Sequence, residues 1–250
     1  MKKFVFAIIL SALLQPLFAQ ETVAKSDSIY RFAPKQLLLP VALVGLGAAG
    51  SLADGIQEFD FGLCGPDRSK VYDGLVAEDF IQYLPAAGFY AMKLSGVNSV
   101  HNYGDATVIL ALSYGMASAA TLACKEIAGV ERPNGVDNRS FTSGHSAIAF
   151  MGAEFLRKEY GASSPWIGAA GYAVAASTAL ARVAHNEHWI TDVVAGAGIG
   201  ILATRTAYWI YPWVERNIVR KLVPRNGNFS FVGIPYCSSE CAGIALALNF

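Results

Sequence analysis

Long uncharged stretches alternate with polar, charged segments along most of this sequence. The apolar runs cover residues 37–53, 80–97, 103–124, 145–156, 165–184 and 190–214. Most of them approach the roughly 20 apolar residues that a helix needs to cross a bilayer. The pattern therefore predicts an all-α protein, a bundle of about six transmembrane helices. The acidic, turn-rich residues 54–79 are expected to form an exposed loop between the first two helices.

The N-terminus has the pattern of a secretory signal. A short basic start, Met1 to Lys3, precedes the apolar run Phe4 to Leu14, and Leu17-Phe18-Ala19 offers a cleavage site. We therefore expect a signal peptide over residues 1–19. An uncleaved anchor is the alternative.

The remaining boundaries follow from changes in composition. Residues 20–36 form a polar segment, residues 37–214 the transmembrane domain, and residues 215–250 a basic tail. Within the tail, residues 228–236 and 242–250 alternate loosely between apolar and polar positions, which predicts a small β-hairpin.

Composition excludes several classes of protein. Hydrophobic residues make up 54% of the chain and charged residues 15%, whereas soluble domains average about 25% charged residues. This content is too apolar for a disordered chain. The formal net charge is zero, with 19 basic and 19 acidic residues, so there is no basic excess for nucleic-acid binding. Four cysteines are too few for a disulfide scaffold.

Three short groups of charged and hydroxyl-bearing residues lie where predicted helices meet polar loops. They are Lys125 to Pro133, Thr142 to His145 and Arg182 to Asp192. Ionisable residues are costly inside a bilayer, so such groups are candidates for function. His188 and Asp192 are four residues apart, and on a helix the carboxylate can therefore orient the imidazole.

Together these residue types suit a phosphate group. Three cations, Lys125, Arg132 and Arg182, match the oxygens of phosphate or of its transition state. Ser143 and Gly144 open a predicted helix, where free backbone N–H groups attract anions. An imidazole oriented by a carboxylate is a nucleophile or a base, and a second imidazole can act as the general acid.

The three groups resemble the signature of the type 2 phosphatidic acid phosphatase (PAP2) family, which shares its core with vanadium haloperoxidases. The family pattern is Lys-x6-Arg-Pro, then Pro-Ser-Gly-His, then Ser-Arg-x5-His-x3-Asp. The corresponding stretches here are Lys125-x6-Arg132-Pro133, Thr142-Ser143-Gly144-His145 and Ala181-Arg182-x5-His188-x3-Asp192. Thr142 and Ala181 depart from the pattern, whereas every charged and histidine position matches. The resemblance covers about residues 80–212 and implies a PAP2/haloperoxidase-type helical bundle.

The resemblance also implies a role for each residue. His188 is the nucleophile that forms a phosphohistidine, Asp192 orients it, and His145 protonates the leaving alkoxide. The phosphate-binding residues are Lys125, Arg132, Ser143, Gly144 and Arg182. The family needs no metal and no other cofactor, and the sequence contains no cluster of metal ligands. His101 and His185 are interpreted as structural, and no role is assigned to Asp137 or Glu187.

The function implied is that of a membrane-bound phosphatase acting on a phosphorylated lipid of the cell envelope. Lipid A phosphate and undecaprenyl pyrophosphate are the first two candidates, followed by phosphatidylglycerol phosphate and phosphatidic acid. A vanadate-dependent haloperoxidase is an alternative, disfavoured because those enzymes are soluble. A non-catalytic phospholipid-binding membrane protein is a third possibility.

Charge distribution predicts a multi-pass protein of the bacterial inner membrane. Arg157, Lys158 and the basic stretch 216–225 favour the cytoplasmic face under the positive-inside rule, which leaves the active site periplasmic. A cleaved signal followed by six crossings gives the opposite orientation. One of these two expectations must therefore fail, unless residues 37–53 do not fully cross.

Overall fold

The computed structural model describes residues 27–51, 77–222, 230–237 and 242–249. The predicted signal peptide and most of the acidic segment 54–79 lie outside these residues. In chain order the elements are η1 (Asp27–Tyr30), α3 (Lys35–Ser51), α5 (Ala77–Ile81), α6 (Leu84–Leu94), α7 (Tyr103–Ala128), α8 (Gly144–Tyr160), α9 (Pro165–Ala184), α10 (Ile190–Val214), η2 (Glu215–Val219), α11 (Arg220–Leu222), β1 (Ser230–Cys237) and β2 (Ala242–Asn249).

Local sequence signals set the ends of the long helices. Asn102 caps the start of α7 by accepting a hydrogen bond from the Asp105 amide at 2.7 Å. Gly129 ends the same helix in the left-handed conformation, with φ of 59°, which glycine adopts without steric cost. Ser143 caps the start of α8, and Pro165 is the first residue of α9. These signals fix where the polar loops begin.

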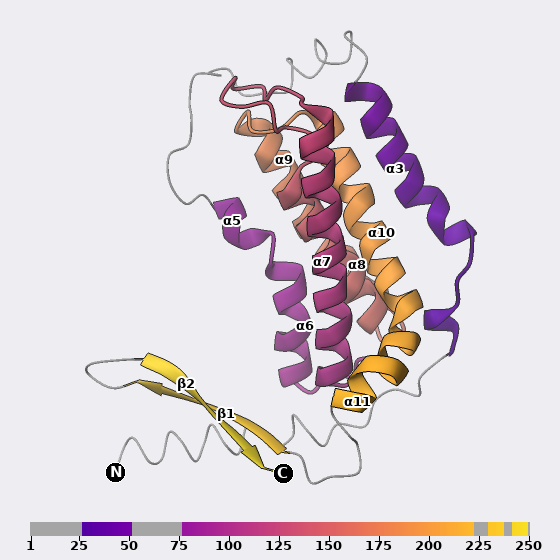
Figure 1. The fold of residues 1–250 in the computed structure, drawn as a ribbon, viewed down its shortest axis with the longest axis vertical. Coiled ribbons are helices and arrows are strands. Elements are labelled where there is room, and N and C mark those ends of the chain that lie inside the picture. The colour runs from indigo at the N-terminus through magenta and orange to yellow at the C-terminus, as the bar shows by residue number, and fades with distance from the viewer. Residues whose placement is uncertain (1–26, 52–76, 223–229, 238–241, 250) are drawn as a thin grey trace. The chain divides into compact units, whose positions relative to one another are not determined.

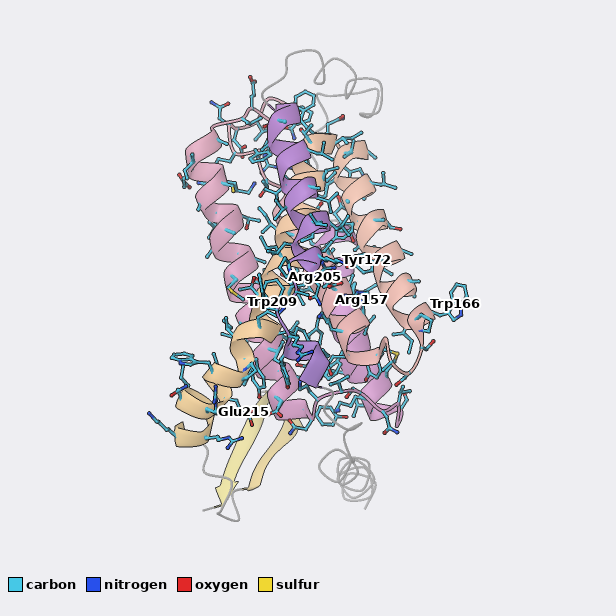
Figure 2. The ribbon with its side chains drawn as sticks, turned by 90° about the vertical axis from the view of Figure 1, so that its right-hand side faces the viewer. Arg157, Trp166, Tyr172, Arg205, Trp209 and Glu215 are labelled. Atoms are coloured by element: carbon cyan, nitrogen blue, oxygen red, sulfur yellow. The ribbon has the colours of Figure 1, made fainter. Side chains whose placement is uncertain are left out.

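Helix α8 is the central element of the bundle, and it packs against α6, α7 and α9 (Figure 1). It is also the most polar of the long helices. Its buried Glu154 accepts hydrogen bonds from Arg157 and Arg205 at 2.7 Å and from Tyr172 at 2.5 Å. Figure 2 shows these three partners close together. A buried carboxylate is tolerated only when it is paired in this way.

Two glycines of α10 allow it to lie directly against the start of α8. A Cβ atom on Gly196 would come within 2.5 Å of the Ser143 carbonyl oxygen, and one on Gly200 within 2.1 Å of the Ala147 carbonyl oxygen. Both distances are shorter than real Cβ contacts, so only glycine fits at either position. Close backbone approach through small residues is typical of membrane helices.

Helix α3 runs antiparallel to α10 (Figure 1). Near its end, Gly47 lies against Thr191 and Ala195 in the first turns of α10. Near its start, the backbone oxygen of Gln36 accepts a hydrogen bond from Arg205, much further along α10. The two ends of α3 therefore lie at opposite ends of the bundle.

Three helical stretches within the described residues are long and apolar enough to cross a membrane, namely Tyr103–Ala128, Pro165–Ala184 and Ile190–Val219. Of the other expected spans, α3, α6 and α8 are shorter. The predicted run 80–97 is interrupted, because Leu84-Pro85 starts a new helix after the short α5. Glu78 was expected in an exposed loop, and that expectation is wrong: its side chain is 2% exposed.

The chain divides into two compact units, the second of which begins at Ile210. In the second unit, η2 is a π-helical turn followed by the short α11. Strands β1 and β2 pair antiparallel, with Ser230 opposite Asn249 and Cys237 opposite Ala242.

Candidate active site

The predicted site residues gather at one end of the bundle. Helices α7 and α9 end there, and α8 and α10 begin there, so the loops 129–143 and 185–189 meet (Figure 1). The amide of Ser143 in the first loop donates a hydrogen bond to the backbone oxygen of Asp192 at 3.1 Å. The Trp189 indole donates to the backbone oxygen of Glu131 at 2.7 Å. These bonds join the three motifs into one site.

His188 and Asp192 form a buried pair. Nδ1 of His188 lies 3.5 Å from Oδ2 of Asp192, and both side chains are almost fully buried. The same carboxylate oxygen accepts hydrogen bonds from the Trp189 amide at 2.9 Å and from the Ser140 hydroxyl. The Trp189 amide and the Ser140 hydroxyl therefore hold the carboxylate in place beside the imidazole. His188 lies just before α10, so the pair forms across the start of the helix and not, as the four-residue spacing predicted, on one helical face.

The surroundings of His188 keep its imidazole neutral. Complete burial is the largest influence, and together with the charges of Lys125 and Arg132 it lowers the pKa of His188 to about 4, while Asp192 opposes the shift. At neutral pH one of the two ring nitrogens of His188 is therefore unprotonated. A neutral imidazole oriented by a carboxylate can act as a nucleophile.

Arg132 and Arg182 are brought together by a carboxylate between them. Glu187 accepts a hydrogen bond from NH1 of Arg132 and another from NH2 of Arg182, the latter at 3.3 Å. Arg132 also donates through Nε to Asp137 at 2.8 Å. In contrast, the Nε of Arg182 is buried and has no hydrogen-bond partner among the described residues. Two guanidinium groups thus hold one anionic group, as a phosphate-binding pair would.

Lys125 lies beside this pair. Its ammonium group donates to the backbone oxygen of Arg139 at 2.5 Å, and its charge acts on Arg132 and Asp192. The three predicted cations therefore share one site with the His188 and Asp192 pair.

Helix α5 adds two carboxylates that were not assigned a role from the sequence. Asp79 Oδ1 lies 2.8 Å from Nε2 of His145, and Glu78 Oε1 lies 2.5 Å from Nδ1 of His185. Glu78 is also 3.4 Å from NH1 of Arg182. Burial raises the pKa of Glu78, but its backbone hydrogen bond and the neighbouring His185 and Arg182 outweigh burial and lower it. Glu78 is therefore ionised in the site.

Ser143 and Gly144 lie at the N-terminus of α8. The Ser143 hydroxyl accepts a hydrogen bond from the Ser146 amide at 3.4 Å, and nothing lies within 4 Å of the position that a Cβ atom on Gly144 would occupy. Open space beside the positive end of a helix is suited to an anion.

Sequence reasoning missed four contributors to the site: Glu78, Asp79, Ser140 and Glu187. The position of Glu187 directly before His188 was the signal that could have placed it in the site. Asp79 and Glu78 carried no signal, because their contacts depend on how a distant helix folds back. Within residues 27–51 and 77–222, no group of three or more His, Cys, Asp or Glu side chains is arranged to hold a metal ion.

Fold and site together define a helical membrane protein with a histidine–carboxylate pair beside a cluster of cations. Residues 106–216 match the sequence model of the PAP2 superfamily, a stretch that includes all eight predicted site residues. The lipid A 1-phosphatase of Porphyromonas gingivalis is 33% identical over 165 residues, which make up 66% of this chain and 36% of that protein. Over these residues the chain is similar to the PAP2 superfamily, and it spans about a third of the length of this curated relative.

The chain is also similar to two solved structures. The PAP2-type phosphatidylglycerolphosphate phosphatase from Bacillus subtilis has a TM-score of 0.47 at 21% identity. LpxE from Aquifex aeolicus has a TM-score of 0.41 at 19% identity. Each comparison covers 72% of this chain and 97% of the other.

Proposed function

We propose that the protein removes phosphate from a membrane lipid through a phosphohistidine intermediate. The observation that carries this proposal is the buried, neutral His188 beside Asp192, next to the cations Lys125, Arg132 and Arg182. A neutral imidazole supplies the electron pair for attack on phosphorus. The cations lower the energy of the transition state, in which negative charge spreads over the phosphate oxygens.

The reaction then has two balanced steps. In the first, a ring nitrogen of His188 bonds to phosphorus, the bond to the lipid oxygen breaks, and His145 gives that oxygen a proton. In the second, water attacks phosphorus, His145 takes a proton from the water, and the phosphorus–nitrogen bond breaks. The products are the dephosphorylated lipid and inorganic phosphate. Ser143 and the Gly144 amide add hydrogen bonds to the phosphate.

Before this reaction, the substrate must displace Glu187. That carboxylate bridges the two arginines whose N–H groups are predicted to bind phosphate. The exchange replaces one anion by another on the same donors, so no guanidinium is left buried without a partner.

We further propose an inner-membrane location with the site on the periplasmic face. Arg157 and Lys158 lie in the last turn of α8, at the end remote from the site. Basic residues favour the cytoplasmic side. Since α3 ends beside the start of α10, this orientation places the start of α3 in the cytoplasm. Export of residue 20 after signal cleavage is incompatible with it, so the N-terminal apolar run then has a role other than a cleaved signal.

For the substrate, lipid A phosphate is our first choice. It is supported by the name of the Porphyromonas gingivalis relative and by a periplasmic site, which faces envelope lipids. Undecaprenyl pyrophosphate is second, and phosphatidylglycerol phosphate or phosphatidic acid third. The three motifs match the phosphate and do not distinguish among these lipids.

The test is phosphate release by the full-length protein, purified in detergent, from each of these lipids separately. Highest kcat/KM on lipid A carrying a 1-phosphate supports the first choice. A higher kcat/KM on undecaprenyl pyrophosphate or on a glycerophospholipid would make that lipid the preferred substrate instead. If phosphate is released from none of these lipids, the phosphatase assignment is contradicted. The phosphohistidine is tested by mixing the protein with a lipid that carries a radioactive phosphate and then quenching the reaction. Radioactivity that stays on the protein and is released by acid supports it, because phosphate on histidine is lost in acid.

A further inference from the structure

The short helix α5 brings a carboxylate to the second histidine of the site. Asp79 Oδ1 lies 2.8 Å from Nε2 of His145, and each side chain is about one quarter exposed, at 28% and 25%. The two residues are 66 positions apart in the sequence. We propose that Asp79 is a positioning residue, which holds the His145 imidazole in the orientation and the protonated form needed to protonate the leaving oxygen. This inference rests on the phosphatase function proposed above.

The location of His145 explains why such a partner is needed. It is the second residue of α8, where the helix dipole is positive, and burial and the charge of Arg182 lower the pKa of its imidazole. A general acid must start the reaction protonated. The hydrogen bond and the charge of Asp79 oppose the lowering, although the pKa of His145 stays below its ordinary value.

The charged groups that face His145 come from two elements. Helix α9 contributes Arg182, and α5 contributes Glu78 and Asp79. Glu78 lies 2.5 Å from His185 and is also bound by Arg182. Of the two acidic residues, Asp79 is therefore the one that contacts the His145 ring directly.

The backbone around Asp79 is fixed, which is what a positioning residue requires. Its carbonyl oxygen accepts a hydrogen bond from the Gln82 amide side chain at 2.9 Å, and Gln82 is 5% exposed. The neighbouring Glu78 ties the same helix to α9. These contacts hold α5 against the site independently of the contact between Asp79 and His145.

The two histidine–carboxylate pairs then have opposite tasks. Asp192 orients an imidazole that burial keeps neutral, whereas Asp79 supports one that must be charged. The pKa of both imidazoles is lowered by burial, and the direct contact with Asp79 is what favours the protonated form of His145.

The experiment compares the wild type, Asp79→Asn, His145→Ala and the double variant, each as full-length protein in detergent. Two substrates are used, dodecyl phosphate with a poor leaving group and para-nitrophenyl phosphate with a good one. We expect Asp79→Asn to lower kcat/KM on dodecyl phosphate about tenfold or more, and less than about threefold on the nitrophenyl ester. The alkaline limb of its pH profile moves to lower pH. In the His145→Ala background Asp79→Asn adds no further loss.

Two further variants separate this role from a structural one. Asp79→Glu keeps the carboxylate and should restore most of the activity on dodecyl phosphate and the alkaline limb. Glu126→Gln removes a carboxylate that is 66% exposed and pairs with Arg139, and it should leave both activities unchanged.

Several results overturn the inference while leaving the phosphatase function intact. One is an equal loss of kcat/KM by Asp79→Asn on both substrates. Another is tighter substrate binding by Asp79→Asn. The third is that Asp79→Asn lowers kcat/KM in the His145→Ala background as much as it does in the wild type. An inactive wild type instead removes the phosphatase function and this inference with it.

Discussion

Nδ1 of His188 lies 3.5 Å from Oδ2 of Asp192, four residues further along the chain. That carboxylate oxygen also accepts hydrogen bonds from the Trp189 amide and the Ser140 hydroxyl. The imidazole therefore faces an acceptor whose position is set by other groups. Burial favours the neutral ring although this carboxylate opposes it, which leads to a prediction about the titration of His188.

The pKa of His188 should be about 4, well below the value near 6.5 of an unperturbed histidine. A lowered pKa means that the ring stays neutral as the pH falls from 7 and takes up its proton only near pH 4. NMR of nitrogen-labelled histidine in detergent micelles measures this directly, and His188→Ala identifies the signal. A midpoint near pH 6.5 contradicts burial as the dominant influence.

Arg182 should not be replaceable by lysine. Its guanidinium contacts Glu78 and Glu187 through two different nitrogens and has a third, buried nitrogen without a partner among the described residues. An ammonium group cannot reproduce this fork. Arg182→Lys should reduce kcat/KM at least about tenfold, or about 1.4 kcal/mol of transition-state stabilisation. If the variant retains wild-type kcat/KM, only the charge of Arg182 matters.

Gly196 should be intolerant of even one methyl group. A Cβ atom there meets the Ser143 carbonyl oxygen at 2.5 Å, so Gly196→Ala must push α10 away from the loop that carries the phosphate-binding residues. We expect at least a tenfold loss of kcat/KM. Gly115→Ala is the matched control, since nothing lies within 4 Å of its Cβ position on α7. Comparable activity of the two variants argues against the close contact between α8 and α10.

Orientation in the membrane can be tested with single cysteines in a chain whose four native cysteines are replaced. Asn138 lies in the loop at the site end, and Ser163 lies between α8 and α9 at the opposite end. A membrane-impermeant maleimide applied to intact spheroplasts should label a cysteine at 138 and not one at 163. The reverse labelling places the active site in the cytoplasm and restores the cleaved signal as the better interpretation.

The motifs in the sequence predicted that their residues meet at one end of the bundle. Lys125, Arg132, His145, Arg182 and His188 all reach the same end of the bundle, because each lies at the end of a predicted helix or in a loop beside one. Periodicity and helix caps are local signals, and the described helices α7, α9 and α10 begin and end close to the expected positions.

The contacts of the site depend on long-range packing, and local patterns do not encode it. Asp79 belongs to an acidic stretch that looks like an exposed loop, yet it contacts His145 because α5 folds back over the start of α8. Lys93 lies in the predicted membrane run 80–97, where a long charged side chain can extend to the membrane surface. It is 4% exposed instead, because it donates to the Ser99 hydroxyl and to the His101 backbone oxygen. In both cases the partner is a polar group that only the folded bundle brings close.

The central claim is that His188 is the group that attacks phosphorus. The most direct measurement is phosphate release from a lipid phosphate by the wild type and by His188→Ala, purified side by side in detergent with equal helix content by circular dichroism. The account predicts steady release by the wild type and no release above background by the variant. Substantial turnover by a folded His188→Ala protein would contradict it, and the nucleophile would then have to be sought elsewhere in the site.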